Sequence, residues 1–279
     1  MFKAGIKRIQ NSILNIINCC KQKPSRLRSK IIFHAIIATF LVFLIVLTCF
    51  IFLNEKTFSS IIEVDELDTY QKWDGSIAQS FSGGTGTKED PYQIASGSEF
   101  IYFKSLIEGS ESSTYNHLYY ILTNHINFNH QQFSPIGIPD SSDPSKSNDH
   151  VFKGDFNGNG YSLANINLIP QKTIFNETYL GLFSLIENGS VRNLNIKNMT
   201  IQMNSDNSSK LFVGGVAGTL LTTEKSSFIQ NIGIYDSNII LKNMSKEENK
   251  TSYIGGLIGY QSDSSKINNC NVYFFCNKD

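Results

Sequence analysis

One continuous apolar run divides the chain into a short basic part and a much longer remainder. The run IIFHAIIATFLVFLIVLTCFIFL covers residues 31–53 and carries no formal charge. As a helix it would extend about 35 Å, which is enough to cross a bilayer core of roughly 30 Å. A buried core helix of this length would show a polar face, and this run shows none. The pattern therefore predicts a transmembrane helix over residues 31–53.

The charges on either side of this run predict its orientation. Residues 1–30 contain eight lysine and arginine side chains and no acidic one, whereas the charged residues within 54–70 are mainly acidic. Basic flanks stay on the cytoplasmic side of a membrane. We therefore predict a cytoplasmic tail over residues 1–30, an acidic stem over residues 54–72 and an extracellular domain over residues 73–279.

A cleaved signal peptide is the alternative interpretation of the apolar run. Its apolar region would be about 7–15 residues long and would end in small residues. The present run is longer and ends in FIFLNEK. We therefore expect an uncleaved signal anchor in a single-pass protein of the cell membrane, with the lipid bilayer as a partner of residues 31–53.

Beyond the predicted stem, one segment has the spacing of an amphipathic helix. The segment SGSEFIYFKSLIEG (96–109) opens with Ser96 and Glu99 at the spacing of a capping box and ends at Gly109. Its apolar residues share one face: Phe100, Phe103, Leu106 and Ile107. We predict a short helix over residues 96–109 that caps the domain that follows.

The rest of the chain alternates apolar and polar residues in a repeated pattern. Four hexapeptides have the form apolar-x-Asn-apolar-x-apolar: LANINL (163–168), VRNLNI (191–196), IQNIGI (229–234) and INNCNV (267–272). Glycine-containing motifs lie between them in phase: YLGLFS (179–184), VGGVAG (213–218) and IGGLIG (254–259). A short amphipathic strand cannot bury its inner face alone, so such repeats stack on one another.

This pattern predicts a mainly β fold, a parallel β-helix or solenoid. In such a stack the repeated Asn side chains can hydrogen-bond to the Asn above and below. Helical solenoids are excluded because segments so rich in Gly and Asn form helices poorly.

The same segments resemble the GLUG-motif repeats of bacterial cell-surface proteins. FKGDFNGNGYSLANINL followed by YLGLFSLIENGSVRNLNI is similar to the repeat. GGTGTKEDPYQIASGSEFIYFKSL, YYILTNHINFN and FSPIGI are similar to the leader that often precedes it. The resemblance covers about residues 73–273 and implies a right-handed β-helix in an attached surface protein without a demonstrated reaction. It departs from the usual leader at His125, where that leader carries an Asp.

The stretch DFNGNG (155–160) has the opening spacing of an EF-hand calcium loop. The twelfth position of such a loop requires a bidentate Glu, but here it is Ile166, and both flanks have β rather than helical patterns. The alternative is a tight turn between two strands, with Asn and Gly supplying the turn conformations. We therefore predict a turn.

The sequence offers few residues that could form a catalytic, cofactor-binding or metal site. Metalloprotease, nucleophile-elbow, phosphate-loop and dinucleotide motifs are absent from the sequence, and His125 and His130 are five residues apart, a poor spacing for a metal site. We therefore predict no catalytic, cofactor-binding or metal-binding residues, and no cofactor.

The enzymatic alternative is a polysaccharide lyase or glycosidase on a β-helix scaffold. Its candidate acids are Asp140, Asp143, Asp149 and Asp155. The first three lie in a loop rich in Ser and Pro, where Asp is an ordinary turn former. Arg192 is the only arginine beyond residue 53, which argues against a site for acidic sugars.

Charge and cysteine content bear on two further classes, nucleic-acid-binding proteins and disulfide-stabilised proteins. The formal net charge is zero, and beyond residue 53 the basic residues form no stripe, so we expect no nucleic-acid partner. The five cysteines do not form a disulfide framework, and a strand-like NVYFF would hold Cys270 and Cys276 too far apart to pair. Cys19 and Cys20, and six N-x-S/T sites, have no assigned role. The sites are Asn176, Asn188, Asn198, Asn207, Asn243 and Asn249.

These observations predict a membrane-anchored cell-surface module without catalysis. Adhesion, through binding of an extracellular glycan or protein, is the first expectation. A structural role as a stalk or spacer is the second.

Overall fold

The computed structural model describes residues 66–139, 150–170, 176–204, 208–242 and 250–274. The predicted tail (1–30), transmembrane helix (31–53) and most of the acidic stem lie outside these ranges. Within them, no helix combines the length and the apolar character that a membrane crossing requires. The membrane anchor therefore stays a prediction.

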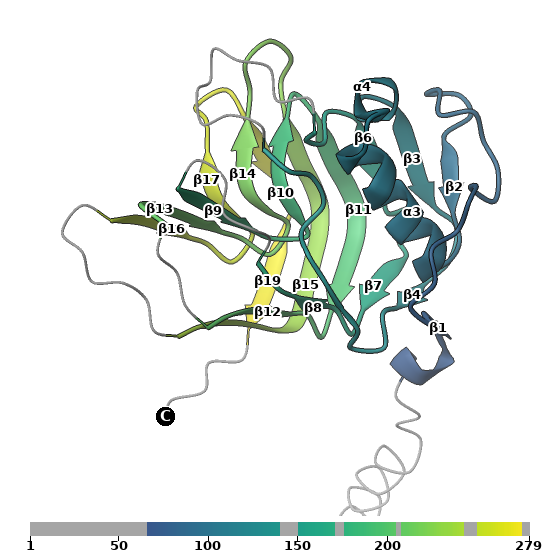
Figure 1. Cartoon of the computed structure of the whole chain (residues 1–279), viewed down its shortest axis with the longest axis horizontal. Coiled ribbons are helices and arrows are strands. Elements are labelled where there is room, and N and C mark those ends of the chain that lie inside the picture. The colour runs from purple at the N-terminus through teal and green to yellow at the C-terminus, as the bar shows by residue number, and fades with distance from the viewer. Residues whose placement is uncertain (1–65, 140–149, 171–175, 205–207, 243–249, 275–279) are drawn as a thin grey trace, which may run out of the picture. The chain divides into compact units, whose positions relative to one another are not determined.

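The described residues form a mainly β fold, a β-solenoid of about three turns, as the repeats predict (Figure 1). We call the strands of one turn a rung. Every pairing between named strands is parallel, so each rung hydrogen-bonds to the one before it. The right-handed sense stays a prediction.

Three stacks of strands form the largest sheet. The first stack is β2 (Tyr92–Ile94), β3 (Tyr119–Leu122), β6 (Asp155–Asn157), β11 (Ser190–Lys197), β15 (Phe228–Leu241) and β18 (Lys266–Asn268). The second is β1 (Gln71–Lys72), β4 (Ile126–Asn127), β7 (Ser162–Ala164), then β11 and β15 again, and β19 (Asn271–Phe274). The third is β5 (Gln132–Phe133), β8 (Asn167–Leu168), β12 (Thr200–Met203) and β15.

Two smaller sheets of three strands each complete the later rungs. One holds β9 (Glu177–Leu180), β13 (Lys210–Val213) and β16 (Thr251–Ile254). The other holds β10 (Phe183–Glu187), β14 (Ala217–Leu221) and β17 (Ile258–Gln261). The three glycine-containing motifs lie between these two sheets.

The fold begins before the predicted domain boundary at residue 73. The 3₁₀ helix η1 (Glu66–Thr69) precedes β1, and β1 pairs with β4. Residues 66–72 therefore belong to the first rung rather than to a separate stem.

A helix fills the N-terminal end of the solenoid. Helix α3 (Gly97–Glu108) lies within the predicted range 96–109, and Ser96 caps it by accepting a hydrogen bond from the Glu99 backbone N–H. The Glu99 carboxylate accepts from the Ala95 N–H rather than from the cap residue itself. A second helix, α4 (Ser112–Tyr115), has only four residues, too few to show a periodic pattern in the sequence.

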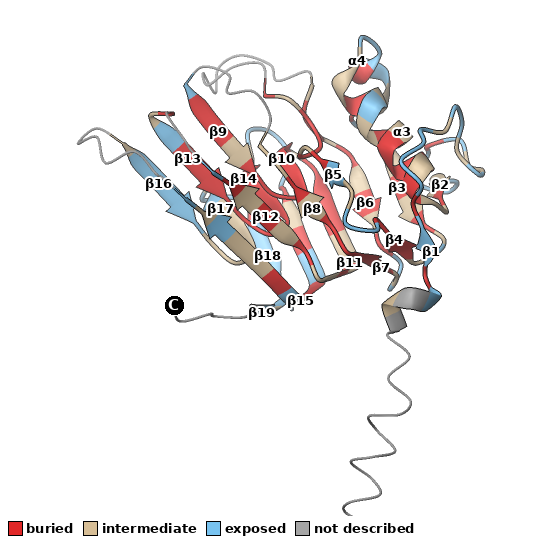
Figure 2. Ribbon diagram, turned by 60° about the horizontal axis from the view of Figure 1, so that its bottom comes forward, coloured by how far each residue is buried: buried red, intermediate tan, exposed pale blue. Residues whose placement is uncertain are grey.

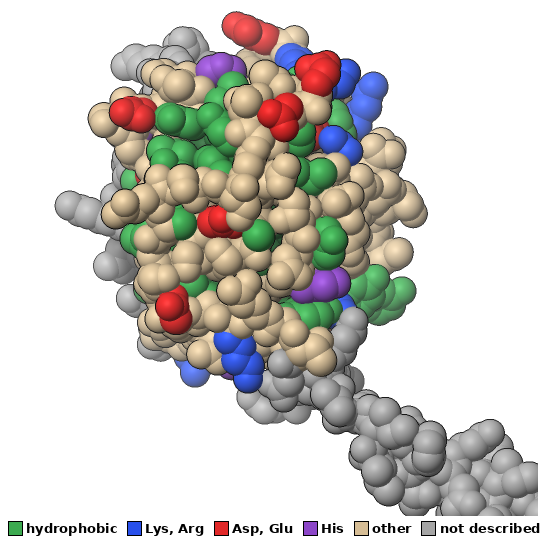
Figure 3. Space-filling model, turned by 90° about the vertical axis from the view of Figure 1, so that its right-hand side faces the viewer, with side chains coloured by type: hydrophobic (Ala, Val, Ile, Leu, Met, Phe, Trp, Pro, Cys, Tyr) green, Lys and Arg blue, Asp and Glu red, His purple; other side chains and the backbone are tan. Residues whose placement is uncertain are grey.

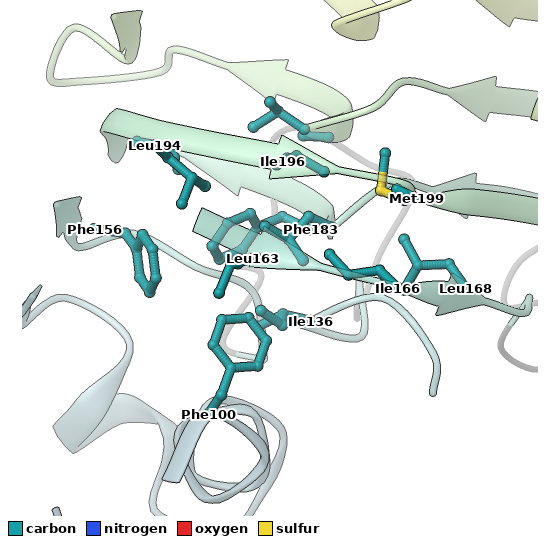
Figure 4. Close-up of a cluster of buried hydrophobic side chains, with 14 of the residues drawn as sticks. Phe100, Ile136, Phe156, Leu163, Ile166, Leu168, Phe183, Leu194, Ile196 and Met199 are labelled. Atoms are coloured by element: carbon teal, nitrogen blue, oxygen red, sulfur yellow. The ribbon is translucent and has the colours of Figure 1, made fainter. Parts of the chain in front are cut away.

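The helix inserts aromatic side chains between the first strands. Phe100 packs edge-on against Phe128 and Phe156, and Phe103 packs edge-on against Phe152. Figure 4 shows Phe100 pointing from the helix toward Ile136 and Leu163. Both phenylalanines are fully buried, so the helix closes this end of the apolar core. Figure 3 views the same end, where acidic and basic side chains are interspersed among neutral ones.

Asparagine side chains form two ladders across the rungs. In the longer one, each Asn donates from its side-chain amide to Oδ1 of the ladder Asn on the rung before it. Asn193 donates to Asn157, Asn231 to Asn193 and Asn269 to Asn231, at 3.0, 2.8 and 2.8 Å. In the shorter one, Asn165 donates to Asn127 and Asn198 donates to Asn165. Asn193, Asn231 and Asn269 have positive φ and bend the strands, as Asn tolerates.

The register differs from the predicted alignment at the first hexapeptide. LANINL does not stack on VRNLNI, because Asn165 lies in the shorter ladder, and Asn157 of DFNGNG takes its place. The cause is an insertion. Asp155 and Ser162 are seven residues apart, yet they pair with Ser190 and Asn195, which are five apart. The turn after β6 therefore contains two extra residues.

Candidate binding surface

The candidate site is the outward surface of the stack that contains β7, β11, β15 and β19. Ile196, Ile234 and the buried Leu163 are in register and point into the core. Because side chains alternate along a strand, their neighbours point outward. We call this outward surface the outer face; its residues are Lys197, Tyr235, Tyr273, Asn195, Gly233 and Asn271, with Tyr70, His125 and Tyr161 packed beside them.

Two tyrosines on adjacent rungs form a stacked pair on the outer face. The rings of Tyr235 and Tyr273 have centroids 5.6 Å apart and an interplanar angle of 11°. Tyr273 is 59% exposed. Gly233 makes room for the first ring, since an added Cβ would lie 2.5 Å from Cε2 of Tyr235. The glycine thus lets the Tyr235 ring lie against its own strand.

A cation and further rings extend this row toward the first rungs. Lys197 is in register with Tyr235, and its Nζ lies 3.2 Å from Oη of Tyr70. The Tyr70 ring stacks on His125 with centroids 4.3 Å apart, and His125 in turn meets the edge of Tyr161. Lys197 also lies over the Tyr70 ring, 5.8 Å from its centroid. The row is therefore continuous over several rungs.

His125 has a structural role in this row. Its Nδ1 accepts a hydrogen bond from the Ser162 backbone N–H at 3.1 Å, and its ring lies between two tyrosines. In the described part of the chain no group of three or more His, Cys, Asp or Glu side chains is arranged to hold a metal ion.

Polar side chains flank the row on the neighbouring stack. The charged Arg192 and the neutral amides Gln230 and Asn268 are in register and point outward. Amide groups both donate and accept hydrogen bonds, so this border offers both to a ligand.

The candidate acid Asp155 is held by its neighbours. Arg192 donates to it from Nε and from an Nη at 3.2 and 2.9 Å, and Ser190 donates its hydroxyl at 2.6 Å. The structure thus brings Asp155 together with Arg192, the one arginine beyond residue 53 in the sequence, in an ion pair within the fold. The other candidate acids, Asp140, Asp143 and Asp149, lie outside the described residues.

In the DFNGNG stretch a second candidate oxygen ligand, Asn157, is engaged as well. Oδ1 of Asn157 accepts from the Asn159 N–H and from the Asn193 side chain. Ile166, at the position where an EF-hand needs Glu, is fully buried. The stretch is strand β6 followed by a turn in which Asn159 and Gly160 have positive φ.

Cys270 is a free thiol whose pKa burial raises. Cys276 lies outside the described residues, so the expectation that the two do not pair stays a prediction.

Sequence reasoning did not find the tyrosine row, although a signal exists. Tyr235 and Tyr273 each follow directly after a hexapeptide, one at 229–234 and the other at 267–272. The residue after a hexapeptide's last apolar position points outward, so an aromatic residue repeated there marks an outer row.

No protein-family model matches the chain, and no curated protein is significantly similar to it. Among solved structures, the chain is similar to a "putative immunoglobulin A1 protease from Bacteroides ovatus" with 16% sequence identity and a TM-score of 0.37. The match covers 70% of this chain and 69% of that one.

Proposed function

We propose that the chain is a membrane-anchored surface module that binds a neutral glycan on its outer face and does not cleave it. Residues 31–53 would hold it in the membrane, with residues 1–30 inside the cell and the solenoid outside. The resemblance to GLUG-motif surface proteins agrees with this role.

The observation that carries the proposal is the stacked pair of Tyr235 and Tyr273. Sugar rings present C–H faces that pack on aromatic rings, and Tyr offers such a surface at low conformational cost. Parallel strands repeat about every 4.8 Å, so a row of rings across rungs provides similar contacts at regular intervals. A polymer of similar units fits such a row.

The polar border supports an uncharged ligand. Gln230, Asn268 and Asn271 provide hydrogen bonds to hydroxyl groups without adding charge. Arg192 is committed to Asp155, with several hydrogen bonds between them, and is therefore a poor receptor for the carboxylates of acidic sugars.

We propose that the chain does not cleave the glycan because the carboxylate of Asp155 is held by hydrogen bonds within the fold. A glycosidase needs a second carboxyl group across the scissile bond, and a lyase needs a free base. Asp155 accepts from Arg192 and Ser190, which ties its oxygens to the fold.

Binding is tested with the full chain purified in detergent and applied to an array of neutral and acidic polysaccharides. We expect retention on neutral glycans, weakened at least about tenfold by Tyr235→Ala, because a central aromatic contact dominates a small interface. Tyr260→Ala is the matched control, since Tyr260 is 42% exposed on the separate sheet that contains β17. An array without signal, or equal loss in both variants, would overturn the proposal.

Two further measurements test the absence of cleavage and the membrane topology. New reducing ends or unsaturated products that disappear in Asp155→Asn would establish the enzymatic alternative instead. Protease added to intact cells should remove the solenoid while sparing residues 1–30, and full protection of the solenoid would refute the topology.

A further inference from the structure

The outer face is covered where it crosses β4 and β7. Ile126 and Leu163 are in register and point into the core. Alternation along the strands then turns Asn127 on β4, and Ser162 and Ala164 on β7, outward. These three residues are nonetheless buried, and Figure 2 shows both strands in the buried colour along their whole length. Another part of the chain therefore lies over this stretch of the outer face.

The side chain that reaches across these strands is Tyr70. Its ring stacks on His125, directly before β4, with centroids 4.3 Å apart and an interplanar angle of 14°. Its hydroxyl accepts a hydrogen bond from Nζ of Lys197, on β11, at 3.2 Å. Because β7 lies between β4 and β11 in the sheet, a ring held by both of these residues lies over β7.

Two short side chains on β7 leave room for this ring. Ala164 is in register with the longer Asn127 on one side and with the longer Lys197 on the other. Ser162 is the other outward residue of the strand. We define the β7 subsite as the place over Ser162 and Ala164 that His125 and Lys197 bracket.

Tyr70 presents to the β7 subsite the kinds of group that a sugar unit presents. A sugar ring has a C–H face that packs on an aromatic ring, and hydroxyl groups that accept hydrogen bonds from an amine. Tyr70 places its ring on His125 and its hydroxyl at Lys197. Tyr235, the aromatic residue of the proposed glycan row, is in register with Lys197 on the next rung. The β7 subsite is therefore in line with that row.

The segment that carries Tyr70 is short and lies at the edge of the sheet. Strand β1 has two residues, both exposed, and is the first strand of its stack. The single turn η1 precedes it, and the carbonyl of Leu67 in η1 accepts from the Asn127 side chain. Trp73, which follows β1, is buried and donates its backbone N–H to the Asn127 carbonyl. Short edge segments open locally while the interior stays folded, so Trp73 marks where the fixed part of the chain begins.

We propose that Tyr70 is an intramolecular occupant of the β7 subsite, and that a neutral sugar unit enters this subsite when residues 66–72 move away. The inference rests on the proposed glycan binding and adds a subsite to it. A glycan chain that lies on Tyr235 and extends past Lys197 competes with Tyr70 for the His125 ring. Short glycans leave Tyr70 in place, whereas longer ones displace it.

Removing the occupant should strengthen glycan binding. A site that is open for only a fraction of the time has an apparent affinity reduced by that fraction. Tyr70→Ala, in the full chain purified in detergent, should therefore be retained at least about tenfold better than the unaltered chain on the array of neutral polysaccharides. Tyr70→Phe keeps the ring on His125 and loses only the hydroxyl, so its retention should fall between the two.

Equal or weaker retention of Tyr70→Ala would overturn the inference, because Tyr70 would then be absent from the competition or would itself contact the glycan. Tyr102→Ala is the matched control, since Tyr102 is a half-buried tyrosine on helix α3, outside the outer face. It should leave retention unchanged.

The two proposals fail in different ways. If neither the unaltered chain nor Tyr70→Ala is retained on any polysaccharide, glycan binding itself is refuted. If the unaltered chain is retained and Tyr235→Ala weakens it, but Tyr70→Ala changes nothing, only the β7 subsite is refuted. Retention of Tyr70→Ala alone would support the subsite and show that Tyr70 closes the row completely.

Hydrogen exchange tests the opening without any glycan. In the unaltered chain the amides of residues 66–72 should exchange faster than those of β11 and β15. In Tyr70→Ala they should exchange faster still, whereas β11 and β15 keep their protection, which also shows that the variant is folded. Equal protection of residues 66–72 and β11 would mean that the segment opens only when the whole fold unfolds, and would overturn the inference.

Discussion

Asn193 donates its side-chain amide to Oδ1 of Asn157 at 3.0 Å, and this contact joins the DFNGNG turn to the repeated hexapeptides. Asn157 is thus the first member of a ladder that continues through Asn231 to Asn269. The spacing that resembles a calcium loop in the sequence is, in the fold, the start of a structural ladder.

The middle of the ladder should be sensitive to substitution. Asn231→Ala removes two ladder hydrogen bonds and places a poorly tolerated side chain at φ 54°, so we expect a loss of about 1–3 kcal/mol in the free energy of unfolding. Asn231→Gly keeps the backbone conformation and should lose less. Asn271→Ala, on the outer face outside the ladders, is the control. Denaturant titration measures all three, and equal stability of Asn231→Ala and Asn271→Ala would contradict the role of the ladder.

Two glycines of DFNGNG should respond differently to Ala. An added Cβ at Gly158 would lie 2.6 Å from the carbonyl oxygen of Asn193, so the backbone must shift. At Gly160 nothing lies within 4 Å of the added atom, and only the positive φ of 81° is costly, by about 1–2 kcal/mol. We therefore expect Gly158→Ala to lower the melting temperature more than Gly160→Ala. The reverse order would show that the turn is not packed as described.

Calcium should not stabilise the protein. Asn157 already accepts two hydrogen bonds through Oδ1, and Ile166 offers no carboxylate. Millimolar calcium or EDTA should therefore leave the melting temperature of the full chain unchanged. A rise with calcium that Asp155→Asn removes would reveal a site at this turn.

Alkaline pH should destabilise the fold through Tyr120. Burial, aided by repulsion from neighbouring tyrosines, raises the pKa of Tyr120, whose hydroxyl donates to the Tyr115 carbonyl at 2.7 Å. The folded state keeps this proton at a pH where the unfolded chain loses it. The stability from this group is therefore complete below about pH 10 and falls above it, by up to about 1.4 kcal/mol per pH unit.

Urea titrations between neutral and strongly alkaline pH measure this slope. Tyr120→Phe should make it shallower while costing about 1 kcal/mol at neutral pH for the lost hydrogen bond. Tyr273→Phe, at an exposed ring, controls for the substitution itself. An unchanged slope in Tyr120→Phe would assign the alkaline loss to other groups.

The amino-acid sequence by itself determined the local structure of the described part. Alternation predicts the strands that carry VRNLNI and IQNIGI, and the Ser96 cap with its apolar face predicts the helix observed at Gly97–Glu108. These features depend on neighbouring residues, so the sequence contains all that is needed to predict them.

The tertiary structure alone decided the register and the outer face. Two extra residues in the turn after β6 moved Asn165 out of the longer ladder and brought in Asn157, which is visible only once the strands pair. Likewise, Lys197 and Tyr70 are 127 residues apart in the chain and meet because successive rungs stack in parallel. Contacts between rungs depend on the number of residues in each intervening turn, and no local pattern specifies that number.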